Sequence, residues 1–331
     1  MSRRLVLASN SFAGSAYVAH ALSLGHEVVG ASRSPEPSPA FLPYRSLPAA
    51  AQAKFRFVQA DINHDLDGLF KLMDEFQPDV VVDFAGQGMV AESWNAPEQW
   101  YQTNVVAKGR LHNFLRKQSW LKRYVRISTP EVYGSSDKLI TEDQTYNPST
   151  PYAVSHAATD MSLKAFHNTL NFPVLLGRFS NFFGEHQQLY RIVPKTILCV
   201  LTGRKLPLHG GGTSVRAFIH AADVANGIEM MIEKGRTGEV YHFSTDQFLT
   251  IREVVERICA KLGVPFENAV EIAGERLGKD QAYLMSTVKA RKELGWTERY
   301  AFDAGLDRTI DWVKSNLAEL KALPWTYSHK A

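Results

Sequence analysis

Short apolar runs alternate with helix-like stretches through the first 178 residues, and this alternation limits the possible folds more than any other feature. Helical patterns cover residues 13–24, 104–118 and 153–169, and another ends near Phe76. Strands that alternate with helices pair in parallel through right-handed crossovers. We therefore expect an α/β fold with a doubly wound parallel sheet. The runs that predict its strands are 5–8, 27–30, 55–59, 80–84, 124–128 and 174–178.

The second half of the chain is organised differently. Residues 181–215 are rich in loop-forming residues around one predicted helix at 193–201. We expect residues 1–178 to form the core, with 215–245 returning to it, and 179–214 and 246–331 to form a smaller, partly interleaved substrate-binding region. Ligands in such folds bind at the carboxyl ends of the strands. Further predicted elements are a strand at 240–243 and helices at 222–234, 251–262, 286–294 and 304–317.

Composition argues against several classes of protein. The formal net charge of +3 is too small to suggest nucleic-acid binding. Cys199 and Cys259 are too few for a disulfide framework, and they lack the spacing of a metal site. Apolar runs stay far below the roughly 20 residues of a membrane span, and the run after Met1 is too short for a signal peptide. We therefore expect a cytoplasmic protein without nucleic-acid, metal or membrane partners.

The loop after the first predicted strand has the spacing of a dinucleotide-binding turn. The pattern Gly-x-x-Gly-x-x-Gly fits here, but Ala8 and Ser11 occupy the first two glycine positions and only Gly14 remains. Gly14 lets the following helix pack closely on the strand, with its N-terminus towards a pyrophosphate. Ser9 and Ser11 are expected to add hydroxyl hydrogen bonds. We assign Ser9, Ser11, Phe12 and Gly14 to a nicotinamide dinucleotide site in a Rossmann core.

The end of the second predicted strand bears on which cofactor is bound. Enzymes that use NAD usually carry an acidic residue there for the ribose hydroxyls, whereas this chain has Ser32 and Arg33. An arginine suits the 2′-phosphate of NADP, so NADP is the predicted cofactor and NAD the second choice. The expected cofactor contacts also include Asp61, Ile62, Ala85 and Gly86.

Two motifs about 20 residues apart carry a family resemblance. Residues 128–134 read Ser-Thr-Pro-Glu-Val-Tyr-Gly, and residues 151–156 read Pro-Tyr-Ala-Val-Ser-His. In this order they resemble the extended short-chain dehydrogenase/reductase family, and within it the nucleotide-sugar 4,6-dehydratases and epimerases. The resemblance covers most of the chain. Further matching segments are 77–79, 103–104, 181–184, 206–210, 223–225 and 293–296.

The resemblance implies a role for each residue of these motifs. Tyr152 is the base that deprotonates the sugar C4 hydroxyl while hydride passes to the nicotinamide. Thr129 hydrogen-bonds the same oxygen, and Glu131 takes the C5 proton. Loss of water across C5 and C6, with return of hydride at C6, then yields a 4-keto-6-deoxy sugar.

Three departures from the family pattern bear on this chemistry. His156 stands where the family has a lysine that lowers the tyrosine pKa and holds the nicotinamide ribose. Either His156 acts as a cation, or it acts as a neutral hydrogen-bonding ribose ligand or proton relay. Pro130 replaces an aspartic acid that protonates the leaving hydroxyl, and Gln281 replaces an arginine that binds the phosphates.

The resemblance also implies a nucleotide-diphosphate sugar as substrate and a homodimer formed by the helices from about Asn104 and Ala153. Arg216 is expected to bind the diphosphate. Two alternatives stay open: an epimerase, decarboxylase or 4-keto reductase limited to C4 chemistry, and a degenerate, non-catalytic dinucleotide-binding protein. The residues expected to bind substrate are Gln87, Asn181, Val193, Pro207, His209 and Arg216.

Overall fold

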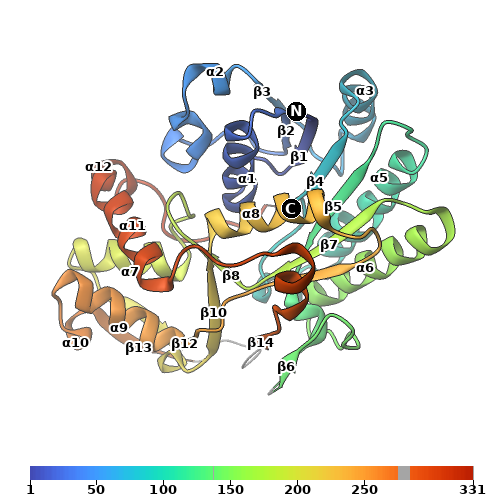
Figure 1. Ribbon diagram of the computed structural model, residues 1–331. Coiled ribbons are helices and arrows are strands. Elements are labelled where there is room, and N and C mark those ends of the chain that lie inside the picture. Colours follow the sequence, from blue (N-terminus) through green and yellow to red (C-terminus); the bar gives the residue numbers. More distant parts are fainter. Residues whose placement is uncertain (137, 275–283, 331) are drawn as a thin grey trace.

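A parallel sheet of seven strands forms the centre of the computed structural model, which describes residues 1–136, 138–274 and 284–330 (Figure 1). The strand order is β3-β2-β1-β4-β5-β7-β11, and every neighbouring pair is parallel. The predicted doubly wound α/β fold is therefore confirmed. Its strands are β1 (Arg3–Leu7), β2 (Glu27–Ser32), β3 (Phe55–Gln59), β4 (Val80–Asp83), β5 (Arg123–Ser128), β7 (Val174–Phe179) and β11 (Val240–Phe243).

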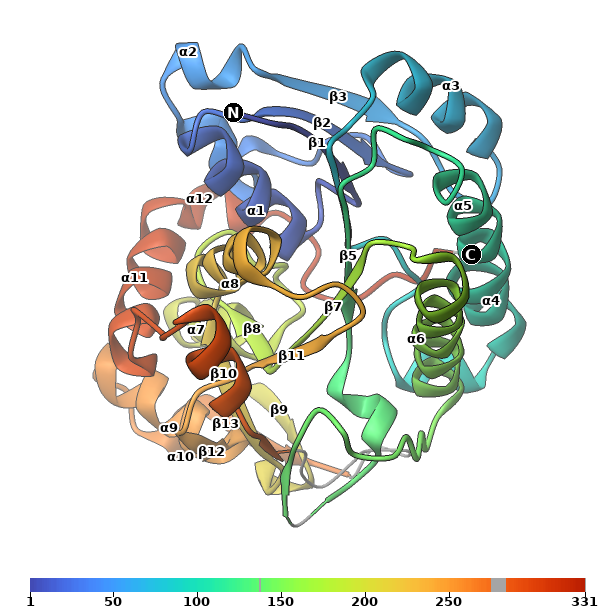
Figure 2. The same ribbon diagram turned by 45° about the vertical axis from the view of Figure 1, so that its right-hand side comes forward.

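Helices cover both faces of this sheet, because alternate strand side chains are apolar on both faces (Figure 2). Val6 and Val82 pack towards α1 (Phe12–Ser23) and α8 (Ala221–Lys234). Leu5 and Val81 belong to the cluster on the other face. The helices of that face are α3 (Leu66–Phe76), α5 (Lys108–Leu115) and α6 (Pro151–Leu170).

The helix predicted at 104–118 is longer at its start and contains an irregular turn. It begins with α4 (Pro97–Tyr101), where a proline occupies the first turn, passes through a π-helical segment (Gln102–Ala107), and continues as α5. Single π turns often occur at functional sites. Here the π turn carries Thr103 and Asn104, which both reach the site described below.

Residues after Phe179 build a second, smaller region around two short sheets. The segment Val215–His220 (β10) pairs with β8 (Asn181–Phe183) and β12 (Phe248–Thr250), whereas α8 and β11 rejoin the main sheet. Part of the stretch 215–245 therefore lies outside the core that we expected it to rejoin. The other elements include β9 (Leu206–His209), β13 (Val270–Ala273), α7 (Ile192–Leu201), α9 (Ile251–Leu262), α11 (Phe302–Ser315) and a π turn at Ala290–Leu294.

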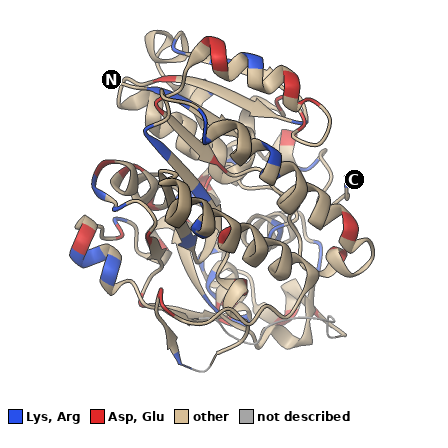
Figure 3. Cartoon of the chain, turned by 90° about the vertical axis from the view of Figure 1, so that its right-hand side faces the viewer, with Lys and Arg blue, Asp and Glu red and all other residues tan. Residues whose placement is uncertain are grey.

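Charged residues of both signs are interspersed along the helices and loops (Figure 3). Such a distribution agrees with the small net charge of the sequence. Within the described ranges, no helix is both long and apolar enough to cross a lipid bilayer.

Candidate active site

A cleft opens at the carboxyl ends of the first four core strands. It lies where β1 has β2 on one side and β4 on the other, which is the point where ligands bind in open α/β sheets. Asn63 and Thr103 also line it, and the Asn63 amide donates to the Thr103 hydroxyl at 3.0 Å. Six of the residues that we assigned to cofactor contact line this cleft, namely Ser32, Arg33, Asp61, Ile62, Ala85 and Gly86.

The loop from β1 into α1 is a tight turn that glycine alone can complete. A Cβ atom at Gly14 would lie 2.2 Å from the Ala8 carbonyl oxygen. Ala8 itself adopts a positive φ of 56° at the first glycine position of the pattern. The first turn of α1, residues 12–15, is uncharged, so its amide groups keep their attraction for an anion. The loop therefore fits a dinucleotide despite its missing glycines.

The two serine hydroxyls of this loop contact the protein itself. Ser11 Oγ donates to the Ala8 carbonyl oxygen at 2.7 Å and accepts the Gly14 amide at 3.2 Å, which makes Ser11 the N-cap of α1. Ser9 is fully buried, with its Oγ 3.4 Å from Ser32 Oγ. The Ser11 hydroxyl proton is directed to the Ala8 carbonyl oxygen, and the assignment of Ser11 to the cofactor site stays a prediction. Phe12 is the first residue of α1 and is buried.

The catalytic candidates meet where β5 ends and α6 begins. Thr129 ends the extended chain after β5, and its Oγ1 accepts the Glu131 amide at 3.3 Å at the start of a short 3-10 helix (Pro130–Tyr133). Tyr152 lies in the first turn of α6, which Thr150 caps. Thr129 hydrogen-bonds Tyr152, and Glu131 is close enough for its charge to act on the phenol. The fold thus brings together residues 129, 131 and 152.

The Tyr152 phenol is a weak acid in this setting. Burial raises its pKa to about 12, and the negative charge of Glu131 acts in the same direction. The hydrogen bond from Thr129 and the positive charge of Arg126 act against this rise. A tyrosine base at neutral pH therefore depends on nearby donors and cations.

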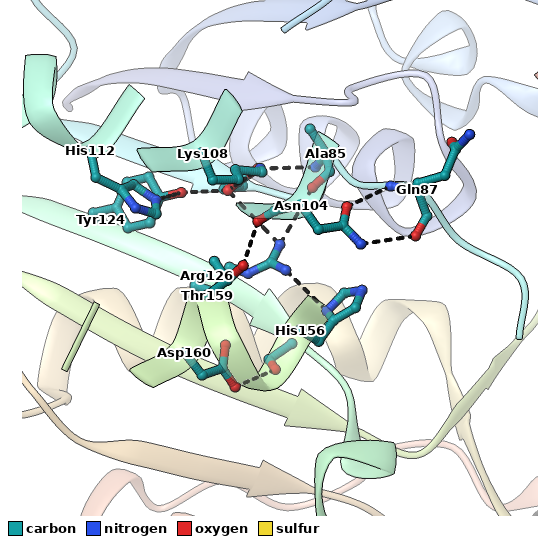
Figure 4. A network of polar contacts seen from close by, with 12 residues as sticks. Ala85, Gln87, Asn104, Lys108, His112, Tyr124, Arg126, His156, Thr159 and Asp160 are labelled. Carbon is teal, nitrogen blue, oxygen red and sulfur yellow. Dashed lines mark hydrogen bonds and ion pairs between the residues drawn. The ribbon is translucent and has the colours of Figure 1, made fainter. Parts of the chain in front are cut away.

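His156 is buried one helical turn after Tyr152, and the two rings lie 4.5 Å apart. Its Nδ1 is 3.0 Å from the Nη2 atom of Arg126, which lies on β5 (Figure 4). Burial, followed by the charges of Arg126, Lys108 and Arg178, holds the pKa of His156 well below its usual value. Of the two roles considered for His156, this environment favours the neutral one.

Arg126 belongs to a buried cluster that sequence reasoning missed. Lys108 forms an ion pair with Asp83, Tyr124 donates a hydrogen bond to the same carboxylate, and Arg126 Nη1 lies 3.9 Å from it. Burial alone would raise the pKa of Asp83, but the two cations hold it below its usual value. A signal did exist, because Asp83 and Arg126 each interrupt a predicted strand that must be covered on both faces.

Gln87 and Asn104 connect the loop after β4 to the π turn (Figure 4). Asn104 Oδ1 accepts the Gln87 amide at 2.7 Å, and Asn104 Nδ2 donates to the Ser155 hydroxyl at 2.9 Å. Gln87 is almost fully buried, and its side-chain amide donates to the Lys330 carbonyl oxygen at 2.5 Å. The C-terminal segment therefore reaches a residue that we assigned to substrate binding.

The other predicted substrate residues lie in the smaller region. Val193 is buried in an apolar cluster within α7, so its side chain is part of a core rather than a contact surface. Arg216 is buried on β10, and its Nη1 donates to the Val215 carbonyl at 2.7 Å. Pro207 is exposed and His209 half-buried on β9, and Asn181 begins β8. Gln281 lies outside the described residues.

Comparisons with known proteins agree on one family. Residues 5–309 match the family described as GDP-mannose 4,6 dehydratase. A dTDP-glucose 4,6-dehydratase of Xanthomonas campestris pv. campestris is 34% identical over 281 residues, which cover 78% of this chain and 79% of that protein. A protein of the same description from Streptomyces antibioticus is 33% identical over 322 residues, covering 95% and 93%.

A solved structure agrees with this relationship. The crystal structure of a dTDP-glucose 4,6-dehydratase from Streptomyces venezuelae, which contains NAD, superposes with a TM-score of 0.87 at 30% identity over 96% of this chain and 98% of that one. The resemblance drawn from the motifs at 128–134 and 151–156 is confirmed, and the NAD in that structure supports a nicotinamide dinucleotide as the cofactor class. The chain belongs to the nucleotide-sugar 4,6-dehydratase and epimerase family of extended short-chain dehydrogenases/reductases.

Proposed function

We propose that this chain catalyses the 4,6-dehydration of a nucleoside-diphosphate hexose, with dTDP-glucose as the first substrate to test. The observation that carries the proposal is that the Glu131 carboxylate lies close enough to the Tyr152 phenol for its charge to raise the phenol pKa. Oxidation at C4 needs one base, and a second base next to it has a use only if a further proton, at C5, is removed. The names of the relatives from Xanthomonas campestris and Streptomyces antibioticus support the same reaction.

Each residue has a defined task in this reaction. Tyr152, as the phenolate, takes the C4 hydroxyl proton, and Thr129 donates a hydrogen bond to the same oxygen. A bound nicotinamide dinucleotide supplies the acceptor for the C4 hydride and the source of the hydride that ends at C6. The C4 ketone acidifies the C5–H bond, and Glu131 removes that proton.

Pro130 leaves the departing C6 hydroxyl without the family's usual acid. We assign this task to Glu131, because the proton that it takes from C5 can pass to the C6 oxygen as the C6–O bond breaks and water leaves. C5 then regains a proton from solvent, and Tyr152 releases the proton taken from the C4 hydroxyl. The net change is the loss of one water, with C4 oxidised and C6 reduced.

Mass spectrometry of the sugar nucleotide tests this proposal. Incubation with dTDP-glucose should give a product lighter by one water, and Glu131→Gln should slow that loss about a thousandfold while C4 oxidation continues. A product of unchanged mass would identify an epimerase. Binding of cofactor and sugar nucleotide without any turnover would identify the non-catalytic alternative.

We also propose NADP as the preferred dinucleotide. Ser32 and Arg33 line the cleft at the end of β2, where an acidic residue would disfavour a 2′-phosphate. Calorimetric titration with NADPH and NADH should show tighter binding of NADPH, and Arg33→Ala should remove the difference. Equal or tighter binding of NADH by the unaltered protein would contradict the preference for NADP; NAD is the dinucleotide that the Streptomyces venezuelae structure contains.

A homodimer and a cytoplasmic location remain predictions. Large apolar side chains are exposed on the helices expected to form the dimer, namely Tyr101 and Val106 before α5 and Val154 and Met161 on α6. A dimer would cover them. Sedimentation should give twice the mass of one chain, and Met161→Glu should shift the protein towards the monomer.

A further inference from the structure

We propose that Arg126, from its buried position on β5, supplies the positive charge that the family places on a lysine at position 156, and that it positions His156 as a neutral donor towards the nicotinamide ribose. Arg126 is a positioning residue in this proposal, since it acts through His156 and on Tyr152. The proposal rests on the proposed function, because the charge serves the Tyr152 base.

The direction of one hydrogen bond determines the tautomer of His156. Arg126 Nη2 and His156 Nδ1 are 3.0 Å apart, and a guanidinium group can only donate. Nδ1 must therefore present its lone pair, and the ring proton resides on Nε2. A doubly protonated ring would place two N–H groups against each other. Nε2 points away from Arg126 (Figure 4), so its proton is available to a group on the far side of the ring.

The buried cluster of Asp83, Lys108 and Arg126 carries a net positive charge next to His156. Lys108 and Arg126 share the carboxylate of Asp83, and the ion pair to Lys108 is the shorter one, with Arg126 Nη1 at 3.9 Å. The neighbouring Arg178 is balanced by Asp160 at 2.9 Å. Arg126 is 1% exposed, so water screens its charge little.

The groups that act on or contact His156 come from four elements. Arg126 lies on β5, Lys108 at the start of α5, Arg178 on β7, and Tyr152 on α6 itself. Three of these four groups carry positive charge. A lysine at position 156 would therefore meet like charges, whereas a neutral imidazole accepts the hydrogen bond from Arg126. The charge of Arg126 also acts on Tyr152, where it favours the phenolate.

Nitrogen NMR of histidine-labelled, ligand-free protein tests the first half of the proposal without any turnover. We expect His156 to remain the neutral Nε2–H tautomer from about pH 5 to 9, the range that brackets ordinary imidazole titration. In Arg126→Met the Nδ1 signal should lose its hydrogen-bond shift. A His156 ring that titrates near its ordinary pKa, or that carries its proton on Nδ1, would overturn the proposal.

A double-mutant cycle tests the second half. Arg126→Met and His156→Lys should each slow hydride transfer at neutral pH at least tenfold, and Arg126→Met should move the alkaline rise of the pH–rate profile upwards by at least about one unit. The double variant, which restores the family's lysine and removes the competing guanidinium, should recover to within about tenfold of the unaltered protein.

The control is Arg123→Met, which removes a half-buried arginine from the first position of the same strand and should leave both rate and pH profile unchanged. If the double variant transfers hydride no faster than the slower single variant, and circular dichroism shows that it is folded, Arg126 does not supply the charge of the family's lysine. If the unaltered protein fails to dehydrate any sugar nucleotide, the proposed function fails, whereas the tautomer measurement still decides the role of Arg126.

Discussion

The side-chain amide of Gln87 donates a hydrogen bond to the Lys330 carbonyl oxygen at 2.5 Å, although 243 positions separate the two residues. The Lys330 ammonium group also lies 2.9 Å from Ser34 Oγ, and the His329 ring stacks on Trp100 with centroids 5.1 Å apart. The C-terminal segment therefore bridges the loops after β2 and β4. Both loops contribute residues to the cofactor cleft, so a ligand that uses the Gln87 amide must displace the Lys330 contact.

Removal of this segment should tighten ligand binding. A chain that ends at Ser328 loses the hydrogen bonds of His329 and Lys330 to Gln87, Gln99 and Ser34, each contributing about 1 kcal/mol. We therefore expect the affinity for a sugar nucleotide, the ligand assigned to Gln87, to rise by up to about a hundredfold. Fluorescence titration measures the change, and Lys321→Ala, at an exposed position seven residues before Ser328, is the control. Weaker binding after truncation would instead make the segment part of the binding site.

The loop after β1 should become more stable when its first glycine is restored. Ala8 has a φ of 56°, which costs a residue with a Cβ about 1–2 kcal/mol. Glycine avoids this cost but loses more conformational entropy on folding than alanine does. We therefore expect Ala8→Gly to raise the free energy of unfolding by up to about 1 kcal/mol. Urea denaturation measures it. Ala13→Gly, within α1, should destabilise by about 1 kcal/mol, and equal effects of both changes would contradict this account.

The pH dependence of hydride transfer should follow Tyr152 alone. Because its pKa is raised to about 12, its phenolate is scarce at neutral pH and increases about tenfold per pH unit. The pKa of His156 is lowered, so this ring stays neutral and adds no descending limb. Single-turnover rates should therefore rise continuously from about pH 6 to 9, and Tyr152→Phe should abolish transfer. A bell-shaped profile would show that a protonated histidine is required.

Acid should destabilise the fold through its buried histidines. Burial lowers the pKa of His112 to about 3 and holds those of His156 and His242 well below the usual value. Below about pH 6.5 these histidines become protonated in the unfolded chain but stay neutral in the folded protein. The free energy of unfolding therefore falls as the pH falls, by roughly 1.4 kcal/mol per pH unit for each ring.

Urea unfolding between about pH 6.5 and 4.5 should therefore show a steep loss of stability, and His112→Phe should make the slope shallower. The exposed His64 offers the matched control, because His64→Asn should leave the slope unchanged. A slope that is the same in all three proteins would mean that carboxylates alone govern acid unfolding.

Periodicity predicted the core elements and the helices of the smaller region well, and the short strands of that region poorly. The strand expected at 55–59 has the observed bounds of β3, and the helix expected at 193–201 differs from α7 by one residue. The strands β8, β9 and β12, of three or four residues, were not predicted. The equally short β4 was recognised from its apolar run of three valines, whereas β8, β9 and β12 lie in loop-rich sequence without such a run, and only their partners in the folded chain make them strands.

The sequence by itself determined the fold class and the meeting of Thr129, Glu131 and Tyr152, because the end of one core strand and the start of the next helix lie at the same edge of a parallel sheet. Only the tertiary structure decided the state of His156. An imidazole pKa depends on burial and on charges a few ångströms away, and the decisive charge belongs to Arg126, 30 positions earlier in the chain and on a different element.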